Sequence, residues 1–284
     1  MKMPAIVRQT LADAGITGPL RMTPMGGGDT ALSARVDSES GCWFVKMHDS
    51  AGLLRAEQAG LEALAPHLRC PAVVGFGEGP SGAVLLLEYL DMRSLQGRAH
   101  WLAAGEALAR LHRVECREGF GRHPDNFIGG SPQSNCNHAD WADFFLHERL
   151  LPQWQQARSL PTAVRDRVEQ VMARLPDWLP ASPRSALVHG DLWQGNLAQV
   201  NGEPVFFDPA CYHGDPQVDL AMLNLFGRVP PAFYEGYQGR EPDRDQQRPW
   251  PVYDLYHWLN HFNLFGGHYA SAVDNTARQL LADG

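Results

Sequence analysis

The segment HGDLWQGN, residues 189–196, carries the side chains best suited to chemistry. Asp191 lies two residues after His189, Asn196 follows five residues later, and Asp208 comes twelve residues beyond that. Phosphoryl transfer from a nucleotide needs one carboxylate that takes the acceptor's proton, and an amide oxygen and a second carboxylate that hold Mg²⁺ on the phosphates. The spacing H-x-D-x-x-x-x-N is also that of kinase catalytic loops. The sequence therefore predicts a phosphotransferase with Asp191 as the base and Asn196 and Asp208 as metal ligands.

Two further residues of this region are interpreted as structural. We expect His189 to support the loop from behind, because the acid that follows it already fills the role of the base. We expect Asp219, in the sequence GDPQVDLA, to hydrogen-bond to the backbone of the same loop.

Upstream, a lysine and a glutamate occur in the order strand, lysine, helix, glutamate. Lys46 lies in the expected strand 42–48, and Glu57 lies in the expected helix 51–65. Kinases use such a pair to hold a lysine against the α- and β-phosphates of ATP. Glu62 lies on the same helix and is the alternative partner, but Glu57 is favoured because it stands one turn before the apolar Leu61.

Two backbone segments are candidates for the rest of the ATP site. Gly27 and Gly28 belong to a three-glycine turn between two expected strands, where N–H groups can approach phosphates, although such a turn can also be simply a flexible hairpin. Glu88, Tyr89 and Leu90 end an apolar strand at the place where a two-lobed kinase binds the adenine edge through its backbone.

The order of elements predicts an α+β fold with a bilobal, protein-kinase-like architecture. Residues 1–90 are expected to form a small ATP-binding lobe with an antiparallel sheet, and residues 91–284 a larger, mainly helical lobe for catalysis and acceptor binding. The expected segments are helices at 3–14, 51–65, 99–113, 139–158, 162–175, 216–226 and 252–281, strands at 32–37, 42–48, 71–79 and 83–90, and a polar loop at 238–251.

Composition narrows the class of protein further. A net charge of −8 argues against a sequence-independent nucleic-acid binder, which would usually be basic. The longest aliphatic run, residues 83–87, is too short to span a membrane, and the N-terminus lacks the apolar run of a signal peptide. The five scattered cysteines contain no C-x-x-C pair, so a zinc site is disfavoured and reduced thiols are expected. A cytoplasmic protein without nucleic-acid or membrane partners is the expectation, and the oligomeric state stays open.

The chain resembles the fructosamine kinase (ketosamine-3-kinase) family, relatives of the aminoglycoside phosphotransferases. The resemblance extends over nearly the whole sequence and includes WFVK, LLLEYL, NFIGGSPQSN, DWADFFLHERLLPQ, HGDLWQGN and FFDPACYHGDPQVDLAM. It implies an ATP- and Mg²⁺-dependent transfer of phosphate to the 3-hydroxyl of a small-molecule or protein-bound ketosamine, followed by loss of the labile sugar phosphate from the amine. The glycine-rich loop here lacks the cysteine that some relatives carry, so redox switching is not implied.

An acceptor sugar needs hydrogen-bonding groups and an apolar wall. Trp193 is the candidate for the wall, and Gln133, Asn135, Asn260 and His261 are candidates for polar contacts. Each of these residues could instead be an ordinary core, loop or helix residue.

Two alternatives remain open at this point. The same catalytic residues would serve a kinase for aminoglycosides, choline or free sugars. A pseudokinase scaffold could bind nucleotide without turnover, although it would have no need of Lys46, Asp191, Asn196 and Asp208 together.

Overall fold

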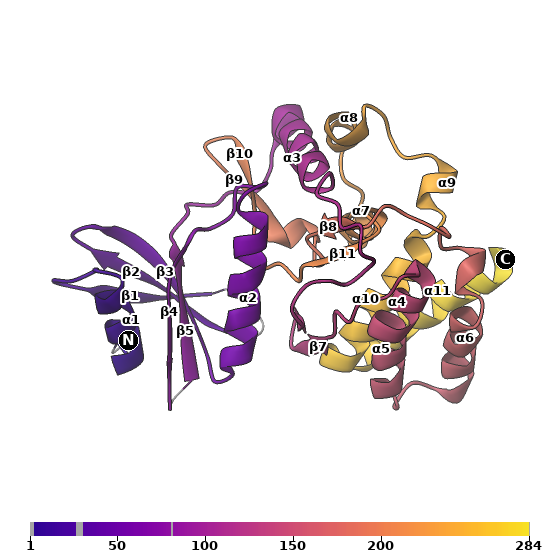
Figure 1. Ribbon diagram of the computed structural model, residues 1–284, viewed down its shortest axis with the longest axis horizontal. Coiled ribbons are helices and arrows are strands. Elements are labelled where there is room, and N and C mark those ends of the chain that lie inside the picture. Colours follow the sequence, from indigo (N-terminus) through magenta and orange to yellow (C-terminus); the bar gives the residue numbers. More distant parts are fainter. Residues whose placement is uncertain (1–2, 27–30, 81, 284) are drawn as a thin grey trace.

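The computed structural model describes residues 3–26, 31–80 and 82–283. Its N-terminal part is a five-stranded antiparallel sheet in the order β1-β2-β3-β5-β4. Helix α1 packs on one face of the sheet, and α2 lies on the other face, between the sheet and the rest of the molecule (Figure 1). The elements of this part are α1 (Ala5–Asp13), β1 (Arg21–Met25), β2 (Leu32–Ser38), β3 (Gly41–His48), α2 (Ala51–Leu64), β4 (Val73–Gly79) and β5 (Gly82–Glu88).

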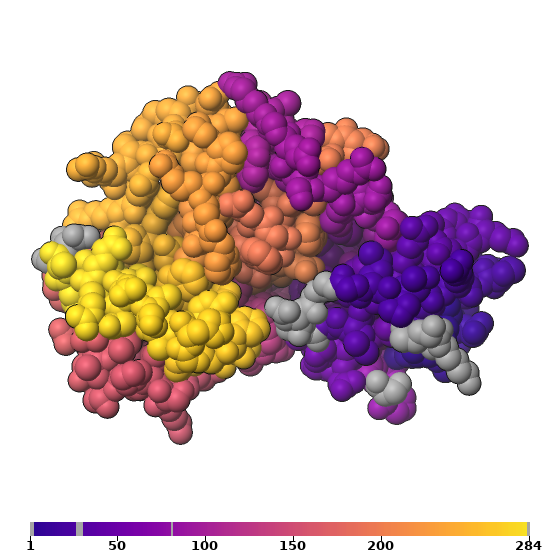
Figure 2. Space-filling view, turned by 180° about the vertical axis from the view of Figure 1, so that it is seen from behind, coloured from indigo at the N-terminus to yellow at the C-terminus, as the bar shows by residue number. Residues whose placement is uncertain are grey.

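The remaining part is mainly helical and contains three short two-stranded sheets. Seen from behind, the N-terminal residues form one end of the elongated molecule and the C-terminal helices lie toward the other (Figure 2). The elements are α3 (Gly97–Leu111), β6 (Asn126–Ile128), β7 (Ser131–Gln133), α4 (Trp141–Phe145), the π-helical turn η1 (Leu146–Leu150), α5 (Leu151–Gln156), α6 (Thr162–Met172), η2 (Leu175–Asp177), β8 (Ala186–Val188), η3 (Gln194–Asn196), β9 (Leu197–Val200), β10 (Glu203–Phe206), β11 (Tyr212–Gly214), α7 (Gln217–Asn224), α8 (Pro231–Gln238), α9 (Arg244–Gln247), α10 (Trp250–Phe265), η4 (Gly267–Tyr269) and α11 (Ala270–Asp283).

The predicted α+β fold is confirmed, and several predicted boundaries are corrected. The expected helix 139–158 is divided by the π-helical turn η1 into α4 and α5. The expected helix 252–281 ends at Gly266, whose φ of +93° is incompatible with continuing the helix, and resumes as α11. The expected loop 238–251 contains the short helix α9, which Asp243 and Gln246 cap reciprocally. Helix α8 was not predicted.

Strand β5 shows how the two-residue period of a strand separates two cores. Val84 and Leu86 pack with α1 in one buried cluster, whereas Leu85 and Leu87 face the opposite way and join the cluster that includes α2 and the helical part. Lys46 pairs with Leu85 across the antiparallel ladder, so its side chain points to the α2 side. The sheet therefore directs this lysine toward the remainder of the chain.

Within the described part of the chain, no helix is both long and apolar enough to cross a membrane.

Helices α3 and α8 cross at two glycines that bring their backbones into contact. A Cβ atom at Gly105 would lie 2.0 Å from the carbonyl oxygen of Phe233, and one at Gly236 would lie 2.0 Å from that of Leu102. A real Cβ cannot occupy either position, so only glycine permits this crossing.

We expect Gly105→Ala to lower the free energy of unfolding by about 1–3 kcal/mol, because α8 must move away from α3. The matched control is Gly52→Ala in α2, where the nearest atom, Oγ of Ser50, lies 3.7 Å from the added Cβ. That change should raise the free energy of unfolding by about 0.5–1 kcal/mol through helix propensity. Urea denaturation of both variants measures the two effects, and equal stability would contradict the inferred close crossing.

Candidate active site

The predicted lysine–glutamate pair is present, and a second carboxylate joins it. Nζ of Lys46 lies 2.6 Å from Oε1 of Glu57 and also makes an ion pair with Oδ1 of Asp208. Glu62, the alternative partner, is exposed and accepts a hydrogen bond from Gln58 instead. Strand β3, helix α2 and the segment after β10 thus meet at one ammonium group.

The two carboxylates at Lys46 differ in their surroundings. The side chain of Glu57 is 11% exposed, whereas that of Asp208 is 40% exposed and can reach a ligand. Burial raises the pKa of Glu57 against the opposing charge of Lys46. Burial alone would lower the pKa of Lys46, but Glu57 and Asp208 together raise it above its ordinary value, so the lysine stays charged.

Asp191 and Asn196 lie on the loop between β8 and β9, beside the β8–β11 pair. The amide nitrogen of Asn196 donates to the backbone oxygen of Asp191 at 2.8 Å and to its Oδ2 at 3.3 Å. Burial raises the pKa of Asp191 to about 7, and the negative charge of nearby Asp208 adds to the rise. A carboxylate tuned to this range is well matched to accept a proton near neutral pH.

A buried carboxylate fixes the start of this loop. Asp219 on α7 accepts hydrogen bonds from the backbone N–H of His189 at 2.7 Å and of Gly190 at 2.9 Å. The ring of His112 lies 3.0 Å from the same carboxylate. His189 itself is fully buried, with Nε2 3.1 Å from the carbonyl oxygen of Phe207. Asp219 thus bonds to the backbone of the loop, and His189 lies buried behind it.

The backbone between His189 and Asp191 requires a glycine at position 190. Its φ is +81°, and a Cβ at this position would lie 2.0 Å from the carbonyl oxygen of Ala210. Any larger residue would push β11 away from the loop, so an H-R-D sequence does not fit this backbone.

Asn196 and Asp208 fit a small hard cation. Since the amide nitrogen of Asn196 makes both bonds to Asp191, its oxygen is left for a ligand. Asp208 adopts the left-handed conformation with φ of +55° and keeps a partly exposed carboxylate. Among the described residues, no three histidine, cysteine, aspartate or glutamate side chains cluster as a metal site. An ion here would take its remaining ligands from phosphates and water, as Mg²⁺ commonly does.

The other residues assigned to the ATP site are placed as follows. Glu88 binds Arg69 through two bonds of 2.7 and 2.8 Å, so its carboxylate anchors the α2–β4 connection. The ring of Tyr89 lies under the guanidinium of Arg35 at 4.5 Å. The carbonyl oxygen of Leu90 accepts from a backbone N–H two residues on. Gly27 and Gly28 lie outside the described residues.

Three of the polar acceptor candidates are engaged inside the protein, and this revises the expectation for them. Gln133 is 3% exposed, donates to Asn126 at 2.8 Å, and accepts from the hydroxyl of Tyr256 at 2.6 Å. Asn135 is 4% exposed and accepts from Arg149 at 2.7 Å. Asn260 is 3% exposed, and its contacts are Gln153 and the carbonyl of Ile128. The sequence shows that these side chains are polar, but only the packing shows that they already have partners.

Trp193 and His261 are instead brought to one aromatic surface. Phe226 joins them, with ring centroids 5.9 Å from Trp193 and 5.5 Å from His261, and Trp258 lies 5.6 Å from Phe226. Trp193 is 40% exposed and Phe226 is 49% exposed, so the surface is open beside the loop of Asp191. Sequence reasoning missed Phe226 and Trp258, although the spacing of Trp258 three residues before His261 places both on one face of α10.

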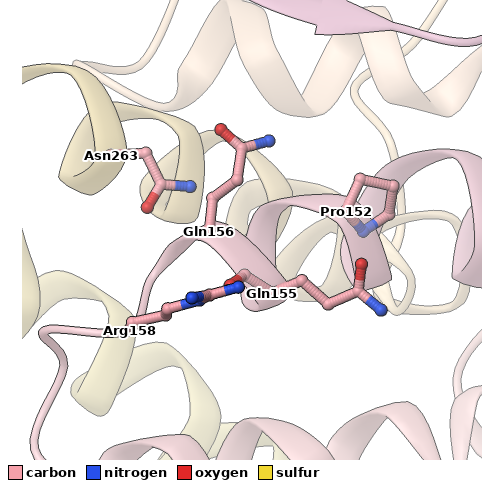
Figure 3. Close-up of a pocket in the computed structure, with 5 residues that line it drawn as sticks. All are labelled: Pro152, Gln155, Gln156, Arg158 and Asn263. Carbon is pink, nitrogen blue, oxygen red and sulfur yellow. The ribbon is translucent and has the colours of Figure 1, made fainter.

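A hollow of about 570 Å³ between α5 and α10 lacks the chemical groups of the candidate site (Figure 3). Its lining consists of Pro152, Gln155, Gln156, Arg158 and Asn263. It contains no carboxylate and none of the residues described above, so it is not a candidate for the chemistry.

Comparison with known proteins finds similar chains over nearly the whole length of the sequence. The profile of the fructosamine kinase family matches residues 4–283. The chain is 41% identical over 255 residues to a "probable ketoamine kinase" of Synechocystis, covering 84% of this chain and 83% of that one. It is 34% identical over 295 residues to the chloroplastic protein-ribulosamine 3-kinase of Arabidopsis thaliana, covering 96% of this chain and 87% of that one.

A crystal structure from Thermobifida fusca, provisionally named a fructosamine-3-kinase, superposes with a TM-score of 0.86 at 28% identity. The match covers 98% of this chain and 99% of that one. This likeness confirms the predicted kinase-type fold.

We expect Asp219→Asn to lower the free energy of unfolding by about 1–3 kcal/mol, because an amide leaves one of the loop N–H donors without an acceptor. Although burial opposes it, hydrogen bonds from His112 and the loop hold the pKa of Asp219 below its ordinary value. A lowered folded-state pKa contributes stability above the unfolded pKa, near pH 4, and loses it as pH falls through the folded value.

The free energy of unfolding of Asp219→Asn should therefore fall less steeply with decreasing pH than that of the wild type. Asp245→Asn, at an exposed position, is the control and should leave both stability and its pH dependence unchanged. Urea denaturation between pH 3 and pH 7 compares the three proteins. The same pH dependence in Asp219→Asn and wild type would contradict the assignment.

Proposed function

The chain belongs to the fructosamine kinase family, and from this premise we propose that it transfers the γ-phosphate of ATP to the 3-hydroxyl of a ketosamine. Adducts of the fructosamine or ribulosamine type are the proposed acceptors, because relatives carry the names ketoamine kinase and protein-ribulosamine 3-kinase. The phosphorylated adduct would be labile and would release the free amine. The proposed role is therefore deglycation.

The observation that carries the proposal is the convergence of two pairs of side chains. Lys46 pairs with Asp208, and Asp191 pairs with Asn196, close enough to Asp208 for that charge to act on it. A positive group for phosphates, a base and two oxygen ligands for a cation thus meet at one place. Phosphoryl transfer is achieved mainly by such positioning and charge stabilisation.

On the nucleotide side, residues 1–90 would hold ATP and residues 91–284 would supply the base and the acceptor surface. Lys46, kept in place by Glu57, would bind the α- and β-phosphates. Backbone groups of residues 88–90 would face the adenine. Asn196 and Asp208 would hold Mg²⁺, which when bound neutralises phosphate charge.

On the acceptor side, Asp191 would orient the sugar hydroxyl and take its proton during transfer. A pKa near 7 leaves a substantial fraction of this carboxylate ionised at neutral pH and still basic enough to accept the proton. Trp193 and Phe226 would pack against the apolar face of the sugar, with His261 beside them as a polar contact.

A substrate panel tests the proposal directly. ATP consumption with Mg²⁺ is measured against ribulosamine and fructosamine adducts, an aminoglycoside, choline and free sugars, with product mass checked for one added phosphate. We expect selective turnover of the ketosamines. Asp191→Asn should lower kcat by about 10²- to 10⁴-fold and leave ATP affinity nearly unchanged. Turnover of another acceptor alone would overturn the substrate, and ATP binding without any turnover would favour a nucleotide-binding scaffold.

The role of the lysine–glutamate pair has its own test. Glu57→Gln removes the charge that holds Lys46 on the phosphates, so kcat/KM for ATP should fall by about ten- to a hundredfold. Glu62→Gln, on the same helix but exposed, is the matched control and should behave as wild type. Equal losses in both variants would instead point to a general weakening of α2.

A further inference from the structure

A second cavity, of about 930 Å³, lies on the helical part of the molecule. It is lined by residues from the end of α3, residues 176–184, the start of α7, the end of α8, and α9 with the residues that follow it. None of the residues proposed for ATP, metal or acceptor binding lines it. The cavity is therefore separate from the active site.

The positive groups of the cavity are incompletely paired. Arg113, Arg184 and Arg248 line it. Arg248 donates to a backbone oxygen, that of Asp177, at 2.6 Å, and Arg184 lies 3.6 Å from Glu115. Within the ranges that the structure describes, Arg113 makes no ion pair. Most N–H donors of these three guanidinium groups are thus available to a ligand.

The negative groups of the same wall are largely committed elsewhere. Asp177 pairs with Arg174 at 2.8 Å. Asp215 is 4% exposed and accepts from the hydroxyl of Tyr253 at 2.7 Å and from the backbone N–H of Gln217 at 3.0 Å. Asp245 is exposed at the rim. The surplus of donors favours an anion, because guanidinium groups match the geometry of phosphate and carboxylate.

The cavity also has apolar walls. Five of its lining residues are prolines: Pro176, Pro180, Pro183, Pro216 and Pro249. Trp178 lines it as well and is 5% exposed. Together these features suit a small organic anion rather than a bare inorganic ion.

One residue of the wall leads to the catalytic loop through hydrogen bonds. The hydroxyl of Tyr237 lies 2.8 Å from Nδ1 of His112, and Nε2 of His112 lies 3.0 Å from Asp219, which holds the loop N–H groups of His189 and Gly190. Because a carboxylate only accepts, Nε2 of His112 donates to Asp219. The chain of bonds therefore connects the cavity wall to the loop.

We propose that this cavity binds a small organic anion bearing phosphate or carboxylate, and that Tyr237, His112 and Asp219 transmit its binding to the catalytic loop. An anion bound to the hydroxyl of Tyr237 would draw this hydroxyl away from Nδ1 of His112. His112 would then lose that hydrogen bond, and its support of Asp219 and the loop would weaken. The ligand would act as an inhibitor that loosens residues 189–190.

Titration calorimetry tests binding with two ligands in separate experiments. The probe is 3-phosphoglycerate, and inorganic phosphate is the comparison. We expect the organic anion to bind more tightly than phosphate. The double variant Arg113→Gln/Arg248→Gln should weaken binding by about tenfold or more. Arg158→Gln, in the hollow of Figure 3, is the matched control and should bind as wild type.

Mg-ATP in excess should not displace the probe. Displacement by ATP, unchanged affinity in the double variant, or no binding of either anion would each overturn the proposed site.

Transmission is tested by hydrogen exchange of the peptide that contains residues 187–197. The probe should speed exchange at the loop in wild type. Tyr237→Phe should exchange faster by about fivefold or more even without probe, and should show no further change when probe binds.

Tyr234→Phe, on the same helix and bonded to Asn224 instead, is the control and should respond like wild type. An equal response of the loop in Tyr237→Phe would refute the transmission. These readouts require no turnover, so their outcome is independent of whether the proposed kinase activity is correct.

Discussion

The contact on which this structure depends is the ammonium group of Lys46 between the carboxylates of Glu57 and Asp208. Burying a charge is costly unless it is paired. The pairing therefore fixes the positions of β3, α2 and the segment of Asp208 relative to one another. Lys46 comes from the sheet and Glu57 from α2, whereas Asp208 comes from a segment far along the chain. The same interaction that balances the buried charge thus also joins the N-terminal part to the helical part.

The backbones around this ion pair approach one another so closely that few other arrangements of the segments are possible. A Cβ at Gly60 of α2 would lie 2.8 Å from Cγ of Pro209, the residue after Asp208. Helix α2 is therefore packed directly against the chain that carries the second carboxylate. Gly190 allows a similar approach between the catalytic loop and Ala210. The positions of the charged groups follow from where the backbones are able to touch, since side chains of any size would hold them apart.

A group of polar side chains around Arg149 is closed to solvent. Arg149 is fully buried, donates to the carbonyl of Ser134 and to Asn135 at 2.7 Å each, and lies 4.0 Å from the ring of Tyr212. Breaking one of these bonds would leave a buried group without a partner, so they hold the SPQSN segment in place. Asn135, a candidate sugar contact from the sequence, is thus part of the protein interior.

The sequence alone predicted the fold class, the lysine–glutamate pair and the residues that we propose as base and metal ligands, because these predictions depend on local periodicity and on motifs with fixed spacing. It could not determine that helix 139–158 contains a π-helical turn or that α8 packs on α3 through glycines, since both depend on contacts between distant segments.

Only the tertiary structure decided which polar side chains are free. Gln133, Asn135 and Asn260 have the same hydrogen-bonding groups as true sugar contacts, but their partners come from elsewhere in the chain and already occupy them. The contacts of Phe226 likewise become visible only when the segment after α7 meets α10 and the loop of Trp193. The link from Tyr237 to His112 becomes visible only when α8 packs on α3. Residue type determines which hydrogen bonds a side chain is able to make, and the partners supplied by the fold determine which of its groups are left for a ligand.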